Sequence, residues 1–270
     1  MHKEVTGMTP VLRIEREGRV ALLTLNRPKA RNALSAALRS ALTAALNEFA
    51  TDVKIDAVIL TGEGKAFCAG ADLKEQGSGE HGQNVAESAG DMSTDLIPAM
   101  ERFPKPLIAA VNGFAVTAGF ELVLACDIIV ASEAAAFADS HVRVGVLPGW
   151  GLSQRLPRLI GFYRASELAY TGRFVLAAEA LEWGLVNRVV PPERLLAESR
   201  AIADEIVSVH AEAVRGYKRL LVEGFAQPLG DALAAEREIA TDFARGVSAG
   251  TLEQRRHGVQ QRGKKETSEG

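Results

Sequence analysis

The stretch 104–127, PKPLIAAVNGFAVTAGFELVLACD, constrains the fold of this chain more than any other part of it. The apolar run at 107–111 is short enough for a buried strand, the NG pair after it signals a turn, and 120–125 has the composition of an apolar helix. Such a strand–turn–helix unit directs free backbone N–H groups, at the positive end of a helix dipole, into one space. Glu121 falls in the first turn of that helix, so a carboxylate stands beside the N–H groups.

Two interpretations of this unit stay open on its own residues. N–H groups beside a carboxylate suit an enzyme that stabilises a developing oxyanion and moves a proton next to it. Small-residue turns are also common in α/β folds, where the glycines serve packing and the glutamate caps the helix. A second stretch favours catalysis, because GKAFCAGADLKE at 64–75 follows a predicted strand at 56–61 and also ends in small residues before a charged, helix-like run. Two such turns would supply two N–H donors to one oxygen.

The other predicted elements follow a repeating order. The segments 11–17 and 20–25 predict a β-hairpin, and Ser35 is a suitable N-cap for a helix over 36–50. The order strand, strand, helix, strand recurs after residue 104. Further predictions are a loop at 76–91, a helix ending at 102, strands at 127–131 and 186–190, an extended stretch at 137–144, and helices at 152–159, 164–170, 177–183, 195–208, 211–223 and 229–246.

Composition argues against several classes of function. A net charge of -3 gives no reason to expect a nucleic acid or a membrane as partner, and no apolar run approaches the roughly 18 residues of a membrane span. Cys68 and Cys126 suit reduced packing residues and the polar N-terminus has no signal-peptide pattern, so we expect a cytoplasmic protein. A G-x-G-x-x-G match at 77–82 lacks the strand and helix of a dinucleotide site. No Cys/His set has metal-ligand spacing, so no metal is expected.

The sequence resembles the crotonase superfamily, the enoyl-CoA hydratase/isomerase family. The resemblance is carried by both stretches described above, together with LNRPKARNALS at 25–35, LPGWGLSQRLPRLIG at 147–161 and TGR…AAEALEWGLVNRVVP at 171–191. The resemblance implies an α/β fold, a crotonase-like spiral of repeated β-β-α units with a C-terminal helical trimerisation region. It implies a core at 1–194 for acyl-CoA binding and catalysis. The remainder, 195–270, would be a helical oligomerisation region with a flexible tail.

The resemblance further implies an acyl-CoA thioester as substrate. Coenzyme A is then part of the substrate, and no separate cofactor is expected. Members of the family assemble as homotrimers or as homohexamers, which are dimers of trimers. The large apolar faces predicted for the C-terminal helices agree with such assembly, because a lone subunit would leave them uncovered.

The resemblance also assigns residues to the site. The thioester carbonyl oxygen would bind the backbone N–H groups of Ala71, in AGAD, and Ala118, in TAGFE. Thr117 stands where the family often has glycine, and a threonine there narrows the backbone freedom. Trp150 stands where small residues are usual in the family, which implies a reshaped acyl pocket. The residues at substrate-binding or CoA-binding positions are Arg27, Lys29, Ala30, Ala69, Asp72, Leu73, Lys74, Gly119 and Trp150.

Hydratases of the family pair two glutamates that share the water and move protons to and from the substrate. The first matches Glu121, whereas His141 occupies the place of the second. Imidazole acts as a general acid or base near neutral pH. Asp139, two residues earlier on a predicted extended strand, would face the same side as His141, either to orient the imidazole or to replace the second carboxylate. The alternative for His141 is that it only lines the acyl pocket.

Three functions remain open on this evidence. The first is an enoyl-CoA hydratase, a hydro-lyase that adds water across the 2,3 double bond. The second is a crotonase-type isomerase or hydrolase, because an oxyanion hole serves any enolate chemistry. The third is a non-catalytic acyl-CoA-binding homologue, which the loss of the second glutamate allows and the retention of Glu121 opposes.

Overall fold

The computed structural model describes residues 10–72, 75, 96–248, 250, 252–253, 255–256 and 259–260. By its internal contacts the chain divides into two compact units, Met1–Arg215 and Gly216–Gly270. The predicted loop at 76–91 lies outside the described residues, as do Leu73 and Lys74.

The first unit begins with the predicted hairpin and helix. β1 (Leu12–Glu17) and β2 (Val20–Leu25) pair antiparallel. β1 exposes five of its six residues and forms one edge of a sheet, whereas β2 is almost wholly buried. α1 (Ala36–Thr51) follows, and the Oγ of Ser35 accepts a hydrogen bond from the N–H of Leu38 at 3.2 Å. The predicted N-cap is therefore confirmed.

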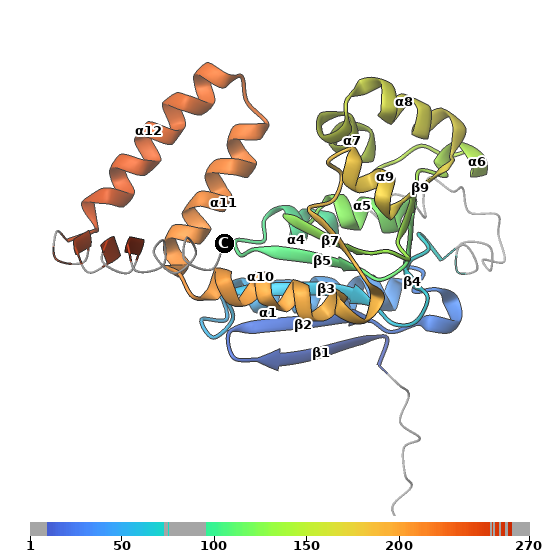
Figure 1. The fold of residues 1–270 in the computed structure, drawn as a ribbon, viewed down its shortest axis with the longest axis horizontal. Coiled ribbons are helices and arrows are strands. Elements are labelled where there is room, and N and C mark those ends of the chain that lie inside the picture. Colours follow the sequence, from blue (N-terminus) through green and yellow to red (C-terminus); the bar gives the residue numbers. More distant parts are fainter. Residues whose placement is uncertain are drawn as a thin grey trace, which may run out of the picture. The chain divides into compact units, whose positions relative to one another are not determined.

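Successive strand pairs build two sheets (Figure 1). The larger sheet has the order β1-β2-β3-β5-β7-β10 and is parallel except for β1, and the smaller has the order β4-β6-β8-β9 with only β9 antiparallel. In each of the pairs β3–β4, β5–β6 and β7–β8 the first strand joins the larger sheet and the second joins the smaller. This confirms the α/β spiral. The strands are β3 (Ala57–Gly62), β4 (Ala66–Cys68), β5 (Leu107–Val111), β6 (Phe114–Val116), β7 (Ile128–Ser132), β8 (Ala136–Ala138), β9 (Phe174–Leu176) and β10 (Arg188–Val190).

The helices lie close to their predicted positions, except for one at His141–Val144 that was not predicted. Short 3-10 turns at Pro28–Ala30 and Pro192–Arg194 begin where proline occupies the first turn. The further helices are α4 (Leu96–Glu101), α5 (Ala118–Leu124), α6 (His141–Val144), α7 (Leu152–Ile160), α8 (Phe162–Thr171), α9 (Ala177–Glu182), α10 (Leu195–Val207), α11 (Ala211–Phe225) and α12 (Leu229–Arg245).

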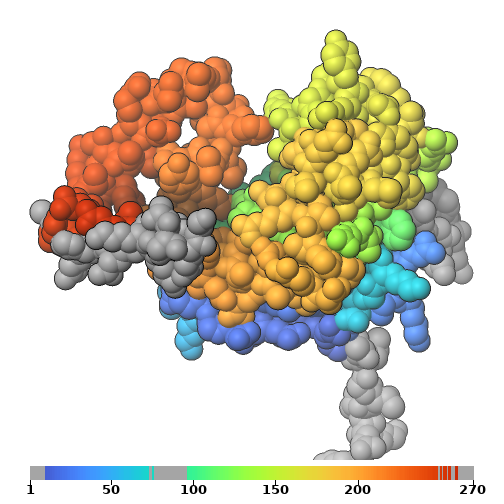
Figure 2. All heavy atoms as spheres, viewed as in Figure 1, coloured from blue at the N-terminus to red at the C-terminus, as the bar shows by residue number. Residues whose placement is uncertain are grey.

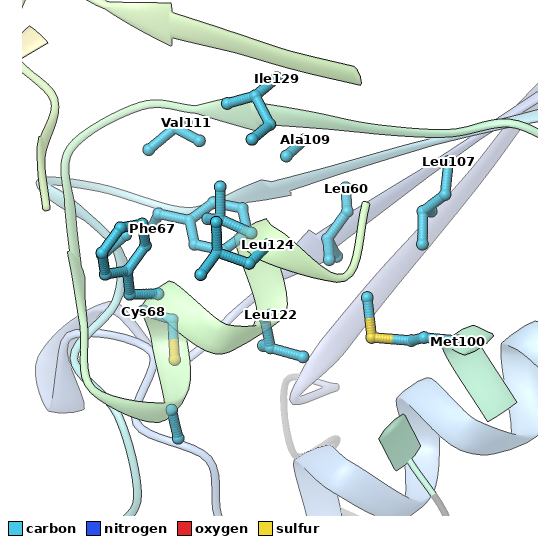
Figure 3. Close-up of a cluster of buried hydrophobic side chains, with 14 of the residues drawn as sticks. Leu60, Phe67, Cys68, Met100, Leu107, Ala109, Val111, Leu122, Leu124 and Ile129 are labelled. Atoms are coloured by element: carbon cyan, nitrogen blue, oxygen red, sulfur yellow. The ribbon is translucent and has the colours of Figure 1, made fainter. Parts of the chain in front are cut away.

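The two faces of the larger sheet enter two hydrophobic cores. Leu107, Ala109 and Val111 of β5 join the main core, to which Leu122 and Leu124 of α5 also belong (Figure 3). The alternate residues, 108 and 110, join a second core on the opposite face, which includes residues of α10. α10 packs across this face, and its side chains cover the strands behind it (Figures 1 and 2). Because β5 is buried on both faces, it is apolar throughout.

One predicted element is wrong in part. The stretch 137–144 was expected to be extended, but β8 ends at Ala138 and α6 begins at His141. The cause is local, because the Asp139 carboxylate accepts the backbone N–H of His141 at 3.2 Å and turns the chain out of the strand.

The C-terminal helices belong partly to each unit. α10 packs on the larger sheet and lies wholly in the first unit, so the division by contacts falls after Arg215 rather than after 194. The assignment of separate roles to 1–194 and 195–270 stays a prediction. α11 and α12 contain no buried residue, and Leu221, Phe225 and Leu229 are among their exposed apolar side chains. Within the described part of the chain, no helix is long and apolar enough to cross a membrane.

Candidate active site

Glu121 is held at the meeting of two helices. It lies in the first turn of α5 and is 2% exposed. Its Oε1 accepts the backbone N–H of Trp150 at 2.7 Å and that of Leu152 at 3.3 Å. Leu152 is the first residue of α7, and Gly151 before it takes φ +99°. The carboxylate therefore occupies the positive end of α7, which favours its ionised form.

Burial acts on Glu121 in the opposite direction and is the larger effect. Removal of the carboxylate from water raises the pKa of Glu121, while the N–H of Trp150, the charge of His141 and the N–H of Leu152 offset part of that rise. A buried carboxyl with a raised pKa changes protonation state nearer to neutral pH than an exposed glutamate does. This is the property that a general acid or base requires.

His141 stands between Glu121 and Asp139. Its Nδ1 lies 2.7 Å from Oδ1 of Asp139, and its Nε2 lies 3.7 Å from Oε2 of Glu121. A carboxylate only accepts, so the Asp139 contact assigns the N–H of neutral imidazole to Nδ1 and directs the Nε2 lone pair toward Glu121. The three predicted catalytic residues are thus brought together. Their contact comes from the turn at Asp139 and not from alternation along a strand.

The two predicted oxyanion turns lie against each other. Ala118 is the first residue of α5, so its N–H has no partner within the helix, and Ala71 directly follows Gly70, whose φ is +97°. A Cβ on Gly70 would lie 2.1 Å from Oγ1 of Thr117, so the two turns touch. Gly119 likewise has no room for a side chain, since a Cβ there would lie 2.1 Å from the Cys68 carbonyl oxygen. Among the described residues, neither alanine N–H donates to a backbone carbonyl.

A loop from β2 to α1 supports the first of these turns. The N–H of Ala69 donates to the Arg31 carbonyl at 3.0 Å, and the N–H of Leu34 donates to the Gly70 carbonyl at 2.8 Å. Asn32, fully buried, donates from its amide to the Ala66 carbonyl at 2.8 Å. These bonds join two segments that are distant in sequence and limit the movement of the 69–72 backbone.

The predicted coenzyme-A residues that the structure describes border this loop. Arg27 forms an ion pair with Asp72 at 2.8 Å and also donates to the Ala33 carbonyl at 2.5 Å. Lys29 is exposed and Ala30 half-buried in the adjacent 3-10 turn. The guanidinium of Arg27 is thus already engaged within the protein. Binding of coenzyme A by Arg27 or Lys29 stays a prediction.

An apolar cavity of about 270 Å³ adjoins two of the predicted catalytic residues, Asp139 and His141. These two, with Ser153 and Ser166, are among its polar lining residues. Its apolar side comes from α6, the turn after it, α7 and α8, and includes Val142, Leu147, Leu156, Phe162 and Tyr170. The cavity would accept an apolar group next to the imidazole.

Trp150 has a different place from these cavity residues. Its side chain belongs to the main hydrophobic core and is 5% exposed, and its backbone N–H binds Glu121. A role of its indole in the acyl pocket stays a prediction.

Cys68 is the thiol nearest to these turns. Burial raises its pKa to about 12. The thiolate is the nucleophilic form of cysteine, so a raised pKa disfavours Cys68 as a nucleophile. Neither Cys68 nor Cys126 forms a disulfide bond.

Sequence reasoning missed two contributions to the site, one from the backbone and one from a side chain. The N–H of Leu152 was not assigned to the site, although the PGWG turn before a helix signals free N–H groups at its start. The side chain of Thr117 was considered only as a limit on backbone freedom, and its contact with Gly70 has no signal in the sequence. Within the described residues, no group of three or more His, Cys, Asp or Glu side chains is arranged to hold a metal ion.

Comparisons with known proteins identify the family to which the chain is similar. The family model described as "Enoyl-CoA hydratase/isomerase" matches residues 15–259. A "Probable enoyl-CoA hydratase 1, peroxisomal" of Arabidopsis thaliana is 39% identical over 96% of each chain. A "Short-chain-enoyl-CoA hydratase" of Clostridium acetobutylicum is 41% identical over 83% of this chain and 86% of its own. The crystal structure of an enoyl-CoA hydratase from Bacillus anthracis is similar with a TM-score of 0.86 and 37% identity, and covers 93% of this chain and 96% of its own.

Proposed function

Because the chain belongs to the enoyl-CoA hydratase/isomerase family, we propose that it is an enoyl-CoA hydratase, a hydro-lyase that adds water across the 2,3 double bond of an enoyl-CoA thioester. The observation that carries the proposal is the buried pair formed by Glu121 and His141, with its facing atoms 3.7 Å apart. That distance exceeds the length of a direct hydrogen bond, so the two side chains are not bonded to each other at these atoms. Both can therefore exchange protons with one substrate placed beside them. Relatives that cover most of this chain carry the same activity in their names.

The pair would carry one proton between its members. With Glu121 ionised and His141 protonated, the carboxylate takes a proton from water as the water oxygen bonds to C3. The imidazolium then gives its Nε2 proton to C2. The proton left on Glu121 returns to His141 and restores the pair. Asp139, at 2.7 Å from Nδ1, would stabilise the imidazolium and hold its orientation.

Two N–H groups would stabilise the charge that develops during the addition. As water attacks C3, negative charge moves onto the thioester oxygen as an enolate. The N–H groups of Ala71 and Ala118 would bind this oxygen, and each such donor is worth about 3 kcal/mol of barrier. The apolar cavity beside His141 would receive the acyl chain.

One observation keeps a second reaction in view. His141 stands in place of the second glutamate, and a Glu–His pair over an enolate could move a proton between carbon atoms of an enoyl chain instead. A crotonase-type isomerase or hydrolase is therefore the alternative activity.

The remaining assignments rest on less direct support. The exposed apolar side chains of α11 and α12 support assembly into a homotrimer or homohexamer. Two free cysteines suit a reducing compartment such as the cytoplasm, although the Arabidopsis relative is named as peroxisomal. Coenzyme A would enter as part of the substrate, with Lys29 as one cation for its phosphates.

Hydration of crotonyl-CoA tests the proposal, because the absorbance of its conjugated thioester fades as water adds. Wild type, Glu121→Gln and His141→Ala are compared, with the exposed Glu182→Gln as a matched control. We expect wild type and the control to hydrate the substrate and both site variants to lose most of the rate. If wild type binds crotonyl-CoA and leaves it unchanged, the hydratase proposal is wrong, and screening for isomerisation or hydrolysis follows.

A further inference from the structure

Thr117 has a backbone conformation that its side chain disfavours. Its φ of 48° and ψ of -119° lie in a region that suits glycine, and a β-branched residue there is a genuine outlier. Neighbouring bonds hold it in place: its N–H donates to the Ala138 carbonyl at 3.0 Å, and its own carbonyl accepts the N–H groups of Phe120 and Glu121 at 2.9 and 3.0 Å. Strain of this kind concentrates at functional sites.

The side chain of Thr117 reaches the opposite turn. Its Oγ1 donates to the Val116 carbonyl at 2.8 Å, which fixes the rotamer. The same oxygen occupies the place that a Cβ of Gly70 would take, at a separation of 2.1 Å. The Thr117 side chain therefore lies against Gly70, whose φ is +97°, in the space that a side chain at Gly70 would need.

These two contacts connect Thr117 to both donors of the oxyanion site. Its carbonyl carbon is bonded to the nitrogen of Ala118, so the strained backbone directs that N–H. Its side chain lies against Gly70, whose carbonyl carbon is bonded to the nitrogen of Ala71. We propose that Thr117 is a positioning residue that sets the separation and direction of the two N–H donors. The inference rests on the proposed oxyanion site but requires no particular reaction after enolate formation.

Substitution of Thr117 by glycine and by serine distinguishes a role in positioning the N–H donors from a role in packing. Glycine adopts the observed φ and ψ without strain, so Thr117→Gly is expected to fold, but it leaves a gap beside Gly70. Thr117→Ser keeps the hydroxyl and its bond to Val116. A misplacement of donors by a fraction of an ångström lowers rates without loss of the fold.

Acetoacetyl-CoA is a suitable probe, because donors to its thioester oxygen favour the enolate, which absorbs in the near ultraviolet. We expect Thr117→Gly to bind it with a smaller enolate signal and to hydrate crotonyl-CoA with kcat lowered about tenfold to a hundredfold. The KM should change little and the melting temperature should not fall. Thr117→Ser should have the enolate signal and the kcat of wild type.

Either of two results with Thr117→Gly would overturn the inference. One is a Thr117→Gly protein that matches wild type within about twofold in enolate signal and kcat. The other is a lower melting temperature for Thr117→Gly together with no rescue by serine, which would assign the side chain to packing. If wild type fails to hydrate crotonyl-CoA but forms the enolate, and Thr117→Gly forms less of it, the hydratase proposal is wrong and the role of Thr117 stands. If wild type forms no enolate, both are wrong.

Discussion

Two clusters of buried charge in the first unit differ in how they are neutralised. Lys105, 3% exposed, donates through Nζ to the carbonyls of Phe49 and Asp52, the latter at 2.7 Å, at the C-terminal end of α1. Glu121, 2% exposed, receives two backbone N–H bonds but faces an imidazole at 3.7 Å. Burial lowers the pKa of Lys105 and raises that of Glu121.

The partners, rather than burial itself, distinguish a structural charge from one that is suited to proton transfer. Lys105 binds the carbonyl groups that a helix end leaves unpaired, so its ammonium completes α1. Glu121 shares its surroundings with a second titratable group beside a cavity. A pair of this kind can exchange a proton, whereas an ammonium bound to fixed carbonyls cannot. The difference predicts that substitutions in the two clusters will affect different properties.

Glu121→Gln should have the largest effect, and that effect is on the reaction rate. The amide keeps the shape of the side chain but takes no proton from water, so we expect kcat to fall by about 10²–10⁴-fold. Thermal melting checks that the fold is retained, and titration with a non-reacting acyl-CoA checks binding. A variant with full activity would contradict the contrast between the clusters.

Lys105→Met should show the reverse pattern. Loss of charged hydrogen bonds to two carbonyls is expected to lower the free energy of unfolding by about 1.5–3 kcal/mol. The kcat of the folded fraction should not change. Denaturant titration measures the loss, and the nearby exposed Lys54→Met is the matched control. Loss of activity without loss of stability would show that this cluster also serves the site.

Asp139→Asn tests the contribution of Asp139 to the cluster that it forms with His141 and Glu121. The amide can present its N–H to Nδ1 and so favour the wrong imidazole tautomer, and we expect kcat to fall about tenfold to a hundredfold. The pH profile of kcat should shift, which a purely structural loss would not cause. Asp231→Asn, in an exposed position, is the control for the same chemical change.

The smallest expected effect concerns stability against pH. Because the folded protein raises the pKa of Glu121 above its ordinary value of 4.5, its native state holds that proton more tightly than the unfolded chain does. The contribution of Glu121 to the free energy of unfolding is therefore full below pH 4.5, where the carboxyl is protonated in both states. It is lost as the pH rises through the pKa that Glu121 has in the folded protein. The free energy of unfolding of Glu121→Gln should therefore increase relative to wild type between about pH 4 and pH 8. An unchanged difference across this range would show that the carboxyl is not destabilised by burial.

Much of the fold and part of the site follow from local sequence. The apolar run 107–111, the N-cap Ser35 and the hairpin around Gly18 each lie where predicted, because strand burial, capping and turn formation depend on residues a few positions apart. The incorrect stretch, 137–144, also has a local cause: Asp139 can bond the backbone two residues later, a property that apolar patterning ignores.

By itself the sequence determined the strand–turn–helix units, the small residues in their turns, and the presence of Glu121, His141 and Asp139 as candidates. Only the tertiary structure decided how they meet. The N–H of Trp150 reaches Glu121 across 29 positions, and the contact of Thr117 with Gly70 joins two separate turns. Such contacts depend on how the two sheets and their helices pack, and packing is a property of the whole core rather than of any segment.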